Sequence, residues 1–341
     1  MRLKSALRRG VAAAVIAGIV VSSGIPAYAI RWDIADGNIT VKGASDESGN
    51  YNEVKQGDNA FKKDEGETVI TGESDKSTVT IDTSKGNVDV TFDDLKIDVS
   101  GKKEGDGNDD GPVRESNAAV TVQGDNDAAI ELDGDNELKS GGYHAGLEKN
   151  ELESKGTLTI KDDNDTKGSL TAEGGAGGGA GIGGKHESGA GNIEITGGTI
   201  KAEGGEGAAG IGGGVYGIGH DIEISGGKVS ATGGNANKNL ESSRPGAAGI
   251  GDGAGPWSEP DPDTPPSNPS NPNNIIICGD AEVTAKAGSQ ILDAEVPAIG
   301  GKYGEVPTDA LSDEEHKVTG GRLTRLNADG TVMEGMGYDY T

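Results

Sequence analysis

A short pattern recurs along the central part of the chain and constrains its fold more than any other feature. The clearest copies are IEITGGTIKAEGGEGAAGIGG (193–213), IEISGGKVSATGG (222–234) with AAGIGDG (247–253), and IIICGDAEVTAKAG (275–288) with PAIGG (297–301), and fainter copies lie at 158–184 and 318–326. The consensus is I-x-I-T/S/C-G-G/D-x-I/V-x-A, a variable loop, and A-G-I-G-G. The interval between G-I-G-G isoleucines is 29 residues from Ile182 to Ile211 and then grows to 39 and 49. Insertions therefore lie in loops at fixed places.

The repeat predicts short strands. Each piece alternates apolar with polar or glycine residues over a few positions, and no piece is long enough for an amphipathic helix. Each unit therefore has three short strands joined by turns, which is one coil of a parallel β-helix. Stacked coils about 4.8 Å apart would place Ile193, Ile222 and Ile275 above one another. We expect an all-β fold, a single-stranded right-handed parallel β-helix with irregular N-terminal coils and a cap at each end.

The same pattern divides the chain. Residues 30–110 hold shorter alternating runs and are expected to form an N-terminal cap and irregular coils. Residues 111–321 would form the β-helix repeats, and residues 322–341 a C-terminal cap. Seven prolines fall within 256–272, which predicts a long loop extruded from one coil, because the repeat resumes directly afterwards. A linker between two half-solenoids is the alternative.

The first 29 residues are expected to be a signal peptide. Four basic residues precede the apolar run GVAAAVIAGIVV, and Ala27-Tyr28-Ala29 provides a small-residue cleavage site. The run is shorter than the ~20 residues of a membrane-spanning helix. We therefore expect a secreted protein, extracellular or at the cell surface, without membrane insertion.

The charge of the chain limits the classes of partner, and its cysteine content excludes an intrachain disulfide. The chain has 30 basic and 57 acidic residues, a formal charge of −27, and losing the four basic residues of the signal would leave −31. Such an acidic protein repels nucleic acid, which is not expected as a partner. Cys278 is the only cysteine, so no intrachain disulfide forms, and we interpret it as a small corner residue stacked with Thr196 and Ser225. We expect a monomer.

The glycines of the repeat have two interpretations. In AAGIGG, alternation points Ala209 and Ile211 inward and leaves Gly210 and Gly212 facing outward. That orientation predicts a bare backbone face that a flat molecule approaches closely. Alternatively, these glycines serve turns that need a positive φ.

Aromatic residues are scarce, so their placement is informative. The candidate carbohydrate-binding residues follow the isoleucine of a G-I-G-G turn by four to seven positions: His186, Tyr216, Trp257 and Tyr303. Tyr143 and His144 precede the related segment AGLEK. Stacked coils would align these rings in a column beside the glycine face, where sugar C–H faces pack on aromatic rings. The alternative is that the rings cover the core at the loop bases.

Acidic turns suggest calcium. Asp106, Asn108 and Asp110 followed by Gly111 match the opening of a calcium loop, but Asn117 occupies the position of the bidentate Glu. Calcium on irregular oxygen-rich loops is therefore a hypothesis, and solvated acidic turns are the alternative. The candidate ligands are Asp106, Asn108, Asp110, Asp125, Asp127, Asp133 and Asp135. The histidines show no zinc-site spacing and are expected to be solvated.

The segments WDIADGNITV, AGLEKN with GTLTI, and the recurring AGIGG with I-x-I-x-G-G-x-I-x-A resemble secreted and surface bacterial proteins of the right-handed parallel β-helix carbohydrate-binding family. The resemblance implies a pectate-lyase-like fold and binding of extracellular polysaccharide, often with calcium, and provides no catalytic residues. We expect a noncatalytic carbohydrate-binding or adhesive protein. A structural surface spacer is the alternative. A polysaccharide lyase is a weaker one, because it needs an Arg or Lys base beside a calcium site, and no Arg lies in the strands of the central coils.

Overall fold

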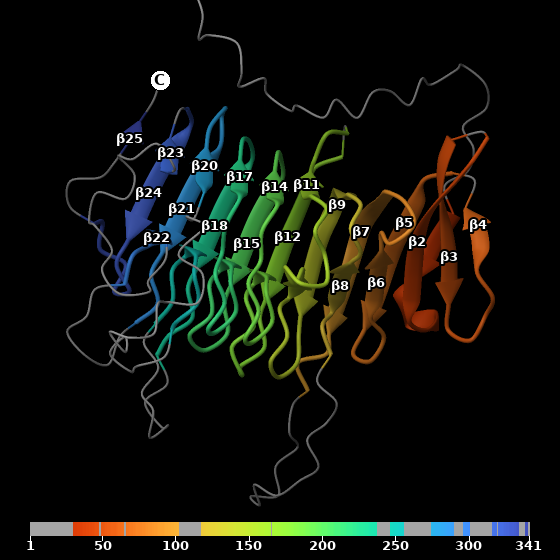
Figure 1. The fold of residues 1–341 in the computed structure, drawn as a ribbon, viewed down its shortest axis with the longest axis horizontal. Helices are drawn as coiled ribbons and strands as arrows, with labels where there is room; N and C mark the ends of the chain where they lie inside the picture. The colour runs from red at the N-terminus through yellow and green to blue at the C-terminus, as the bar shows by residue number, and fades with distance from the viewer. Residues whose placement is uncertain are drawn as a thin grey trace, which may run out of the picture.

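The computed structural model describes residues 30–47, 49–64, 66–101, 117–164, 166–236, 246–255, 274–289, 296–300, 316–318, 320–333 and 338–339. These residues form an all-β body of parallel strands whose long axis follows the chain from N- to C-terminus (Figure 1). The predicted signal peptide and the proline-rich segment 256–272 lie outside the described residues. The described helix is the single 3-10 turn η1 (Ile34–Asp36), and no helix in this part of the chain has the length and apolar character to cross a membrane.

The described strands belong to two sheets. The large sheet contains β1 (Ile30–Asp33), β5 (Thr68–Ser74), β7 (Val88–Asp98), β9 (Ala128–Lys139), β11 (Leu158–Lys161), β12 (Gly168–Glu173), β14 (Ile193–Ile195), β15 (Thr199–Glu203), β17 (Ile222–Ile224), β18 (Lys228–Thr232), β20 (Ile275–Ile277), β21 (Glu282–Lys286), β23 (His316–Val318), β24 (Arg322–Leu326) and β25 (Tyr338–Asp339). The small sheet contains β2 (Ile39–Asp46), β3 (Gly49–Gln56), β4 (Lys62–Asp64), β6 (Val79–Asp82), β8 (Val120–Gln123), β10 (Leu147–Glu148), β13 (Ile182–Gly183), β16 (Ile211–Gly212), β19 (Ile250–Gly251) and β22 (Ile299–Gly300).

The repeat sets the register of both sheets. In the large sheet Ile193 pairs with Ile222 and Ile222 with Ile275, each time in parallel. In the small sheet Ile211 pairs with Ile182 on one side and with Ile250 on the other. The predicted stacking of equivalent isoleucines is therefore confirmed. We call each group of one small-sheet strand and the following large-sheet strands a unit.

Alternation along each strand builds the core. In β14 and β17 the outer two isoleucines are buried and the central glutamate is partly exposed. Ile211 is 0% exposed, and deleting such a buried side chain to alanine typically costs about 2–5 kcal/mol. Because every unit adds the same buried row, one hydrophobic core runs through the whole described body.

The N-terminal units differ in having long strands. In β9, Ala128–Glu131 pairs with β11 and Gly134–Lys139 pairs with β12, so one strand takes the place of two. The strand bends at Gly134, whose φ of 63° is left-handed. Parallel pairing continues across the predicted boundary at residue 111, since β6 pairs with β8 and β7 with β9.

Antiparallel strands lie at both ends of the described body. At the N-terminal end, β3 pairs antiparallel with β2 and β4 pairs antiparallel with β3. At the C-terminal end, β25 pairs antiparallel with β24. Such strands cover backbone edges that would otherwise be open to pairing with another chain.

Candidate carbohydrate-binding site

The glycines of the small sheet do not form the bare outer face that alternation predicts. Gly210 and Gly212 are buried. A Cβ added at Gly210 would lie 2.6 Å from the Thr232 nitrogen and 2.7 Å from the Gly249 oxygen. At Gly212, φ is +131° and a Cβ would overlap the Gly251 oxygen. The prediction of an exposed glycine face is therefore wrong, because these glycines permit close backbone approach and positive φ.

Backbone of several segments packs against this glycine row: Thr232, at the end of β18, lies against Gly210, and a Cβ at Gly219, in the loop after β16, would be 2.9 Å from Gly212 Cα. The loop before a small-sheet strand bonds to the loop that follows the small-sheet strand of the next unit. Val215 N donates to Gly178 O at 2.9 Å, and Ala254 N donates to Gly207 O at 2.7 Å. We call this line of contacts the loop seam. Alternation in the sequence does not show which backbone segments pack against these glycines.

Three aromatic rings meet at the loop seam. His186 N donates to Tyr143 O at 2.8 Å, which belongs to the same pattern of loop contacts. The His186 ring packs edge-on against Tyr143 at a centroid distance of 5.2 Å and against Tyr216 at 5.6 Å. Tyr143 is 55% exposed and Tyr216 is partly exposed. The structure thus brings together three rings, one from the loop before β10 and one each from the loops after β13 and β16, which we call the ring column.

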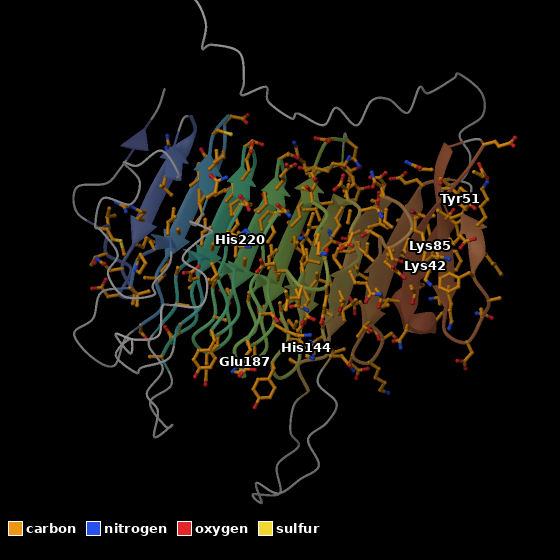
Figure 2. All side chains as sticks on the ribbon, in the orientation of Figure 1. Lys42, Tyr51, Lys85, His144, Glu187 and His220 are labelled. Carbon is orange, nitrogen blue, oxygen red and sulfur yellow. The ribbon has the colours of Figure 1, made fainter. Side chains whose placement is uncertain are left out.

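The other two candidate aromatic residues, Trp257 and Tyr303, lie outside the described residues. Figure 2 shows His144 and Glu187, the chain neighbours of the ring column, along the same edge of the molecule. Tyr51 lies near the N-terminal end, remote from that edge. The ring column is therefore a local feature of the edge where the loops meet.

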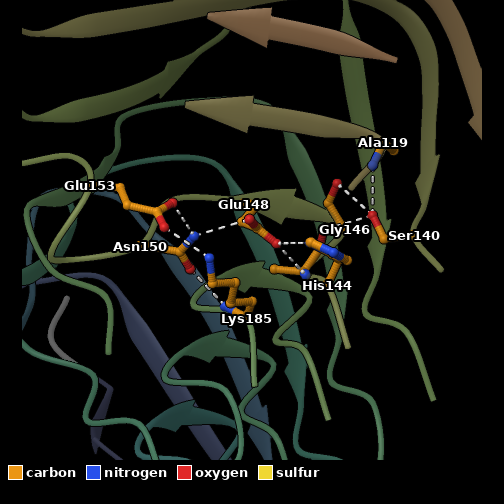
Figure 3. Close-up of polar contacts among 9 residues, drawn as sticks. Ala119, Ser140, His144, Gly146, Glu148, Asn150, Glu153 and Lys185 are labelled. Carbon is orange, nitrogen blue, oxygen red and sulfur yellow. Dashed lines mark hydrogen bonds and ion pairs between the residues drawn. The ribbon is translucent and has the colours of Figure 1, made fainter. Parts of the chain in front are cut away.

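A polar network includes His144 and Lys185, the chain neighbours of Tyr143 and His186 (Figure 3). Its centre is Glu148, which pairs with Gly183 in the next unit and so occupies a glycine position of the repeat. Glu148 Oε2 lies 2.7 Å from His144 Nδ1 and accepts from Ala145 N at 3.3 Å. Glu148 Oε1 accepts from Asn150 Nδ2 at 3.0 Å. Both carboxylate oxygens are therefore satisfied, as a buried charge requires.

The network continues toward the next unit. Asn150 Nδ2 also donates to Glu153 Oε2 at 2.8 Å, and Asn150 Oδ1 accepts from Lys185 N at 2.9 Å. Lys185 Nζ forms an ion pair with Glu153 Oε1 at 2.8 Å. The hydrogen bond from Lys185 lowers the pKa of the Glu153 carboxyl, and the same bond raises the pKa of Lys185. These contacts connect His144 with Lys185, the chain neighbours of Tyr143 and His186, through the polar groups between them.

Lys149 is buried on the other side of this strand end. The residue is 1% exposed, and its Nζ donates to Ser154 O at 3.1 Å and to Gly191 O at 2.7 Å. Burial lowers the Lys149 pKa to about 8, against the attraction of Asp127 and Glu151. Because Gly191 belongs to the next unit, Lys149 joins two units through their backbones.

His220 departs from the expectation of a solvated histidine. It is 6% exposed, with Nδ1 2.8 Å from Asp221 Oδ2 and Nε2 3.3 Å from Glu151 Oε1. Glu151 lies two units away, and the unit between them has Gly189 and Gly191. A Cβ at Gly191 would overlap the His220 ring. The missing side chain lets His220 contact Glu151 across the unit between them.

The candidate calcium ligands are not gathered into a site where they are described. Asp127 Oδ1 accepts from Thr157 N at 2.9 Å, and Asp133 Oδ1 accepts from Asn164 Nδ2 at 2.6 Å. Asp135 Oδ1 accepts from Ser169 Oγ at 2.8 Å, and Asp125 lies between β8 and β9. No three His, Cys, Asp or Glu side chains form a metal-binding group in the described ranges. The residues Asp106, Asn108 and Asp110 lie outside those ranges.

One detail of the calcium hypothesis is wrong. Asp133 and Asp135 were expected in an acidic turn, but both belong to the long strand β9, at its bend. The Asp-Gly-Asp sequence is typical of a turn. Here the bend at Gly134 keeps the ladder hydrogen bonds to β12, so the chain changes direction without leaving the sheet.

Cys278 occupies the predicted corner position. Cys278 N donates to Ile224 O at 2.9 Å, just as Ser225 N donates to Ile195 O at 2.9 Å one unit earlier. Burial raises the pKa of the Cys278 thiol, and the nearby Glu223 carboxylate raises it further. Such surroundings favour the thiol over the reactive thiolate.

Comparisons with known protein families, curated proteins and solved structures find no match for this chain. The resemblance to carbohydrate-binding β-helix proteins thus remains a prediction from the residues. Sequence reasoning found the residues of the ring column but missed the network around Glu148. The available signal was the register of AGLEKN against AGIGGK, which puts Glu148 where the repeat has glycine.

Proposed function

We propose that this protein is a secreted, noncatalytic carbohydrate-binding protein that holds a neutral extracellular glycan at the ring column. The observation that carries the proposal is the contact of Tyr143, His186 and Tyr216 across successive units at an exposed edge. Sugar rings pack their C–H faces on aromatic side chains, and a row of such rings suits a polymer better than a single sugar.

The proposed fold explains why the rings are in a row. In a single right-handed parallel β-helix, each turn of the chain adds one unit at the strand spacing of about 4.8 Å. The ring centroid distances of 5.2 and 5.6 Å are close to that spacing. Trp257 and Tyr303, from the two later units, would extend the same row.

Charge favours a neutral ligand. The chain carries a formal charge of −27, and the network that includes His144 contains the buried carboxylate of Glu148 and the exposed carboxylate of Glu153. An anionic polysaccharide would have to approach these groups against repulsion. Hydroxyl groups of a neutral sugar make hydrogen bonds at such a polar edge without a charge penalty.

A glycan array tests this function, followed by affinity electrophoresis through gels that contain the soluble neutral polysaccharide best retained on the array. We expect wild-type protein to be retarded, and Tyr143→Ala with Tyr216→Ala to abolish the retardation while circular dichroism is unchanged. Each aromatic contact contributes roughly 0.5–1.5 kcal/mol beyond its buried area, so the double change should weaken binding more than either single one.

Tyr51→Ala is the matched control, because Tyr51 is a partly exposed tyrosine at the far end that packs under Lys63 Nζ at 4.1 Å. It should leave retardation unchanged. Absence of any retained glycan would reject the proposal in favour of a structural spacer. A double variant that binds normally per folded molecule would reject the ring column.

A further inference from the structure

His144 has one ring nitrogen fixed by the protein and the other accessible. Its Nδ1 lies 2.7 Å from Glu148 Oε2. A carboxylate accepts hydrogen bonds and does not donate them, so the shared proton is on Nδ1 and the neutral ring has its acceptor at Nε2. The His144 side chain is 27% exposed, and no partner for Nε2 occurs in the described part of the chain.

Glu148 is held so firmly that it determines the orientation of the ring. Its side chain is 4% exposed, and its oxygens also accept from Ala145 N and Asn150 Nδ2. The aligned Gly183 and Gly212 of later units have no side chain, so this carboxylate belongs to the β10 unit. An oriented histidine with a buried carboxylate behind it is the arrangement by which proteins fix the tautomer and direction of an imidazole.

The accessible Nε2 belongs to the residue that follows Tyr143 of the ring column, and its partner Glu148 continues a polar row of the small sheet. Tyr143, the next residue in the chain, is 55% exposed and packs on His186. On the other side, Glu148 follows Thr121 and Thr80 in the register of the small sheet, and both threonines are partly exposed. The chain thus has a hydrogen-bond acceptor on the residue that follows the exposed ring of Tyr143.

We infer that His144 is a specificity-determining residue that accepts a hydrogen bond from a sugar hydroxyl through Nε2, and that Glu148 is its positioning residue; this rests on the proposed glycan-binding function. The ligand class is a sugar that presents a hydroxyl or hydroxymethyl group beside the face stacked on Tyr143. A uronic acid carboxylate is rejected there, because it has no proton for Nε2 and approaches the charge of Glu148.

The first measurement is the tautomer of the His144 ring in the protein without ligand. The ¹⁵N and ¹H chemical shifts of the His144 ring in wild-type protein report which nitrogen carries the proton. We expect the Nδ1–H tautomer. In Glu148→Gln the amide both donates and accepts, so we expect a mixture of tautomers. An Nε2–H tautomer in the wild type would overturn the inference.

The second measurement is affinity electrophoresis through gels of paired polymers: galactan against polygalacturonate, and hydroxyethylcellulose against carboxymethylcellulose. We expect wild-type protein to prefer the neutral member of a pair. His144→Ala should weaken binding to it by roughly three- to tenfold, the size of one polar contact, and reduce the preference. Glu148→Gln should weaken it in the same direction, although Glu148 does not contact the sugar.

Glu131→Gln is the matched control, since Glu131 is also a buried glutamate, paired with Lys161 at 2.8 Å in the large sheet. It should change stability without changing retardation. If the double tyrosine variant loses binding and His144→Ala does not, the proposed function stands and this inference fails. If wild-type protein is retarded by no polymer, the proposed function fails and this inference fails with it.

Discussion

Glu194 and Glu223 lie opposite each other on β14 and β17, an arrangement that repeats whenever one unit copies the next. Partial burial raises the pKa of the Glu194 carboxyl, and the Glu223 carboxylate raises it further. A carboxyl whose pKa is higher in the folded than in the unfolded protein favours folding when protonated. The associated stability is present below 4.5, the ordinary pKa of a glutamate side chain, and is lost as pH rises through the folded pKa.

Glu194→Gln should therefore raise the melting temperature at pH 7 and lose this advantage near pH 4, where wild-type Glu194 also takes up its proton. Thermal melts of both proteins at the two pH values measure the difference. Glu73→Gln is a control, because its side chain is 75% exposed and such charges contribute little to stability. A gain of the same size at both pH values would show that repulsion is not its cause.

Lys149 illustrates how a single buried charge is accommodated in this body. Its ammonium group has no carboxylate within ion-pair distance among the described residues, and it is satisfied by the carbonyls of Ser154 and Gly191. A protein interior tolerates a charge only where hydrogen bonds replace water. The lysine thus stabilises the contact of two units at a position where the next two units have Gly184 and Gly213.

At the scale of the element, the small-sheet strands are two residues long from β10 onward and are held between two loops. Ala180 N donates to Gly184 O at 2.9 Å, and Ala209 N donates to Gly213 O at 3.0 Å, which draws the two ends of each strand together. A side chain at the glycine positions of these strands would overlap the backbone of neighbouring segments. Glycine is therefore required by packing as well as by φ.

Gly212→Ala tests this requirement against Gly49→Ala. Gly49 has a similar φ of +121° but open space around its Cα, whereas a Cβ at Gly212 would overlap Gly251 O. Backbone strain should cost each variant about 1–3 kcal/mol. We expect Gly212→Ala to cost clearly more in chemical denaturation, because the next unit must also move. Equal costs would mean that the contact with Gly251 of the next unit does not require glycine at position 212.

The strands of this repeat protein show which features of the fold can be predicted from the sequence. The pairing of Ile211 with Ile182 and Ile250 follows from spacing alone, because a row of buried isoleucines tolerates no shift of one residue. Spacing does not tell which loops fold over a strand, so burial of Gly210 was missed. The Glu148 network was missed for the same reason, since its partners come from two different loops.

In the whole molecule, the stacking of units places acidic side chains of neighbouring strands close together, just as it aligns the isoleucines. Burial raises the pKa of Asp133, and the carboxylates of Asp93 and Glu131 on neighbouring segments raise it further, against a hydrogen bond from Asn164. With a formal charge of −27 over the chain, self-repulsion opposes the compact state. Any divalent cation would relieve part of it, so general screening must be separated from a specific calcium site.

Calcium binding to the acidic segment at 105–111 would stabilise the folded protein by mass action, by about 2.7 kcal/mol when the free ion is at 100 times its dissociation constant. We expect the melting temperature to be higher in millimolar calcium than in chelator. Magnesium at the same concentration should give a smaller rise, because it screens charge equally but binds reluctantly to irregular oxygen ligands. In the double variant Asp106→Asn with Asp110→Asn, the melting temperature in calcium should fall to the melting temperature in magnesium. Equal midpoints in calcium and magnesium for the wild-type protein would leave only screening, and the calcium hypothesis would be abandoned.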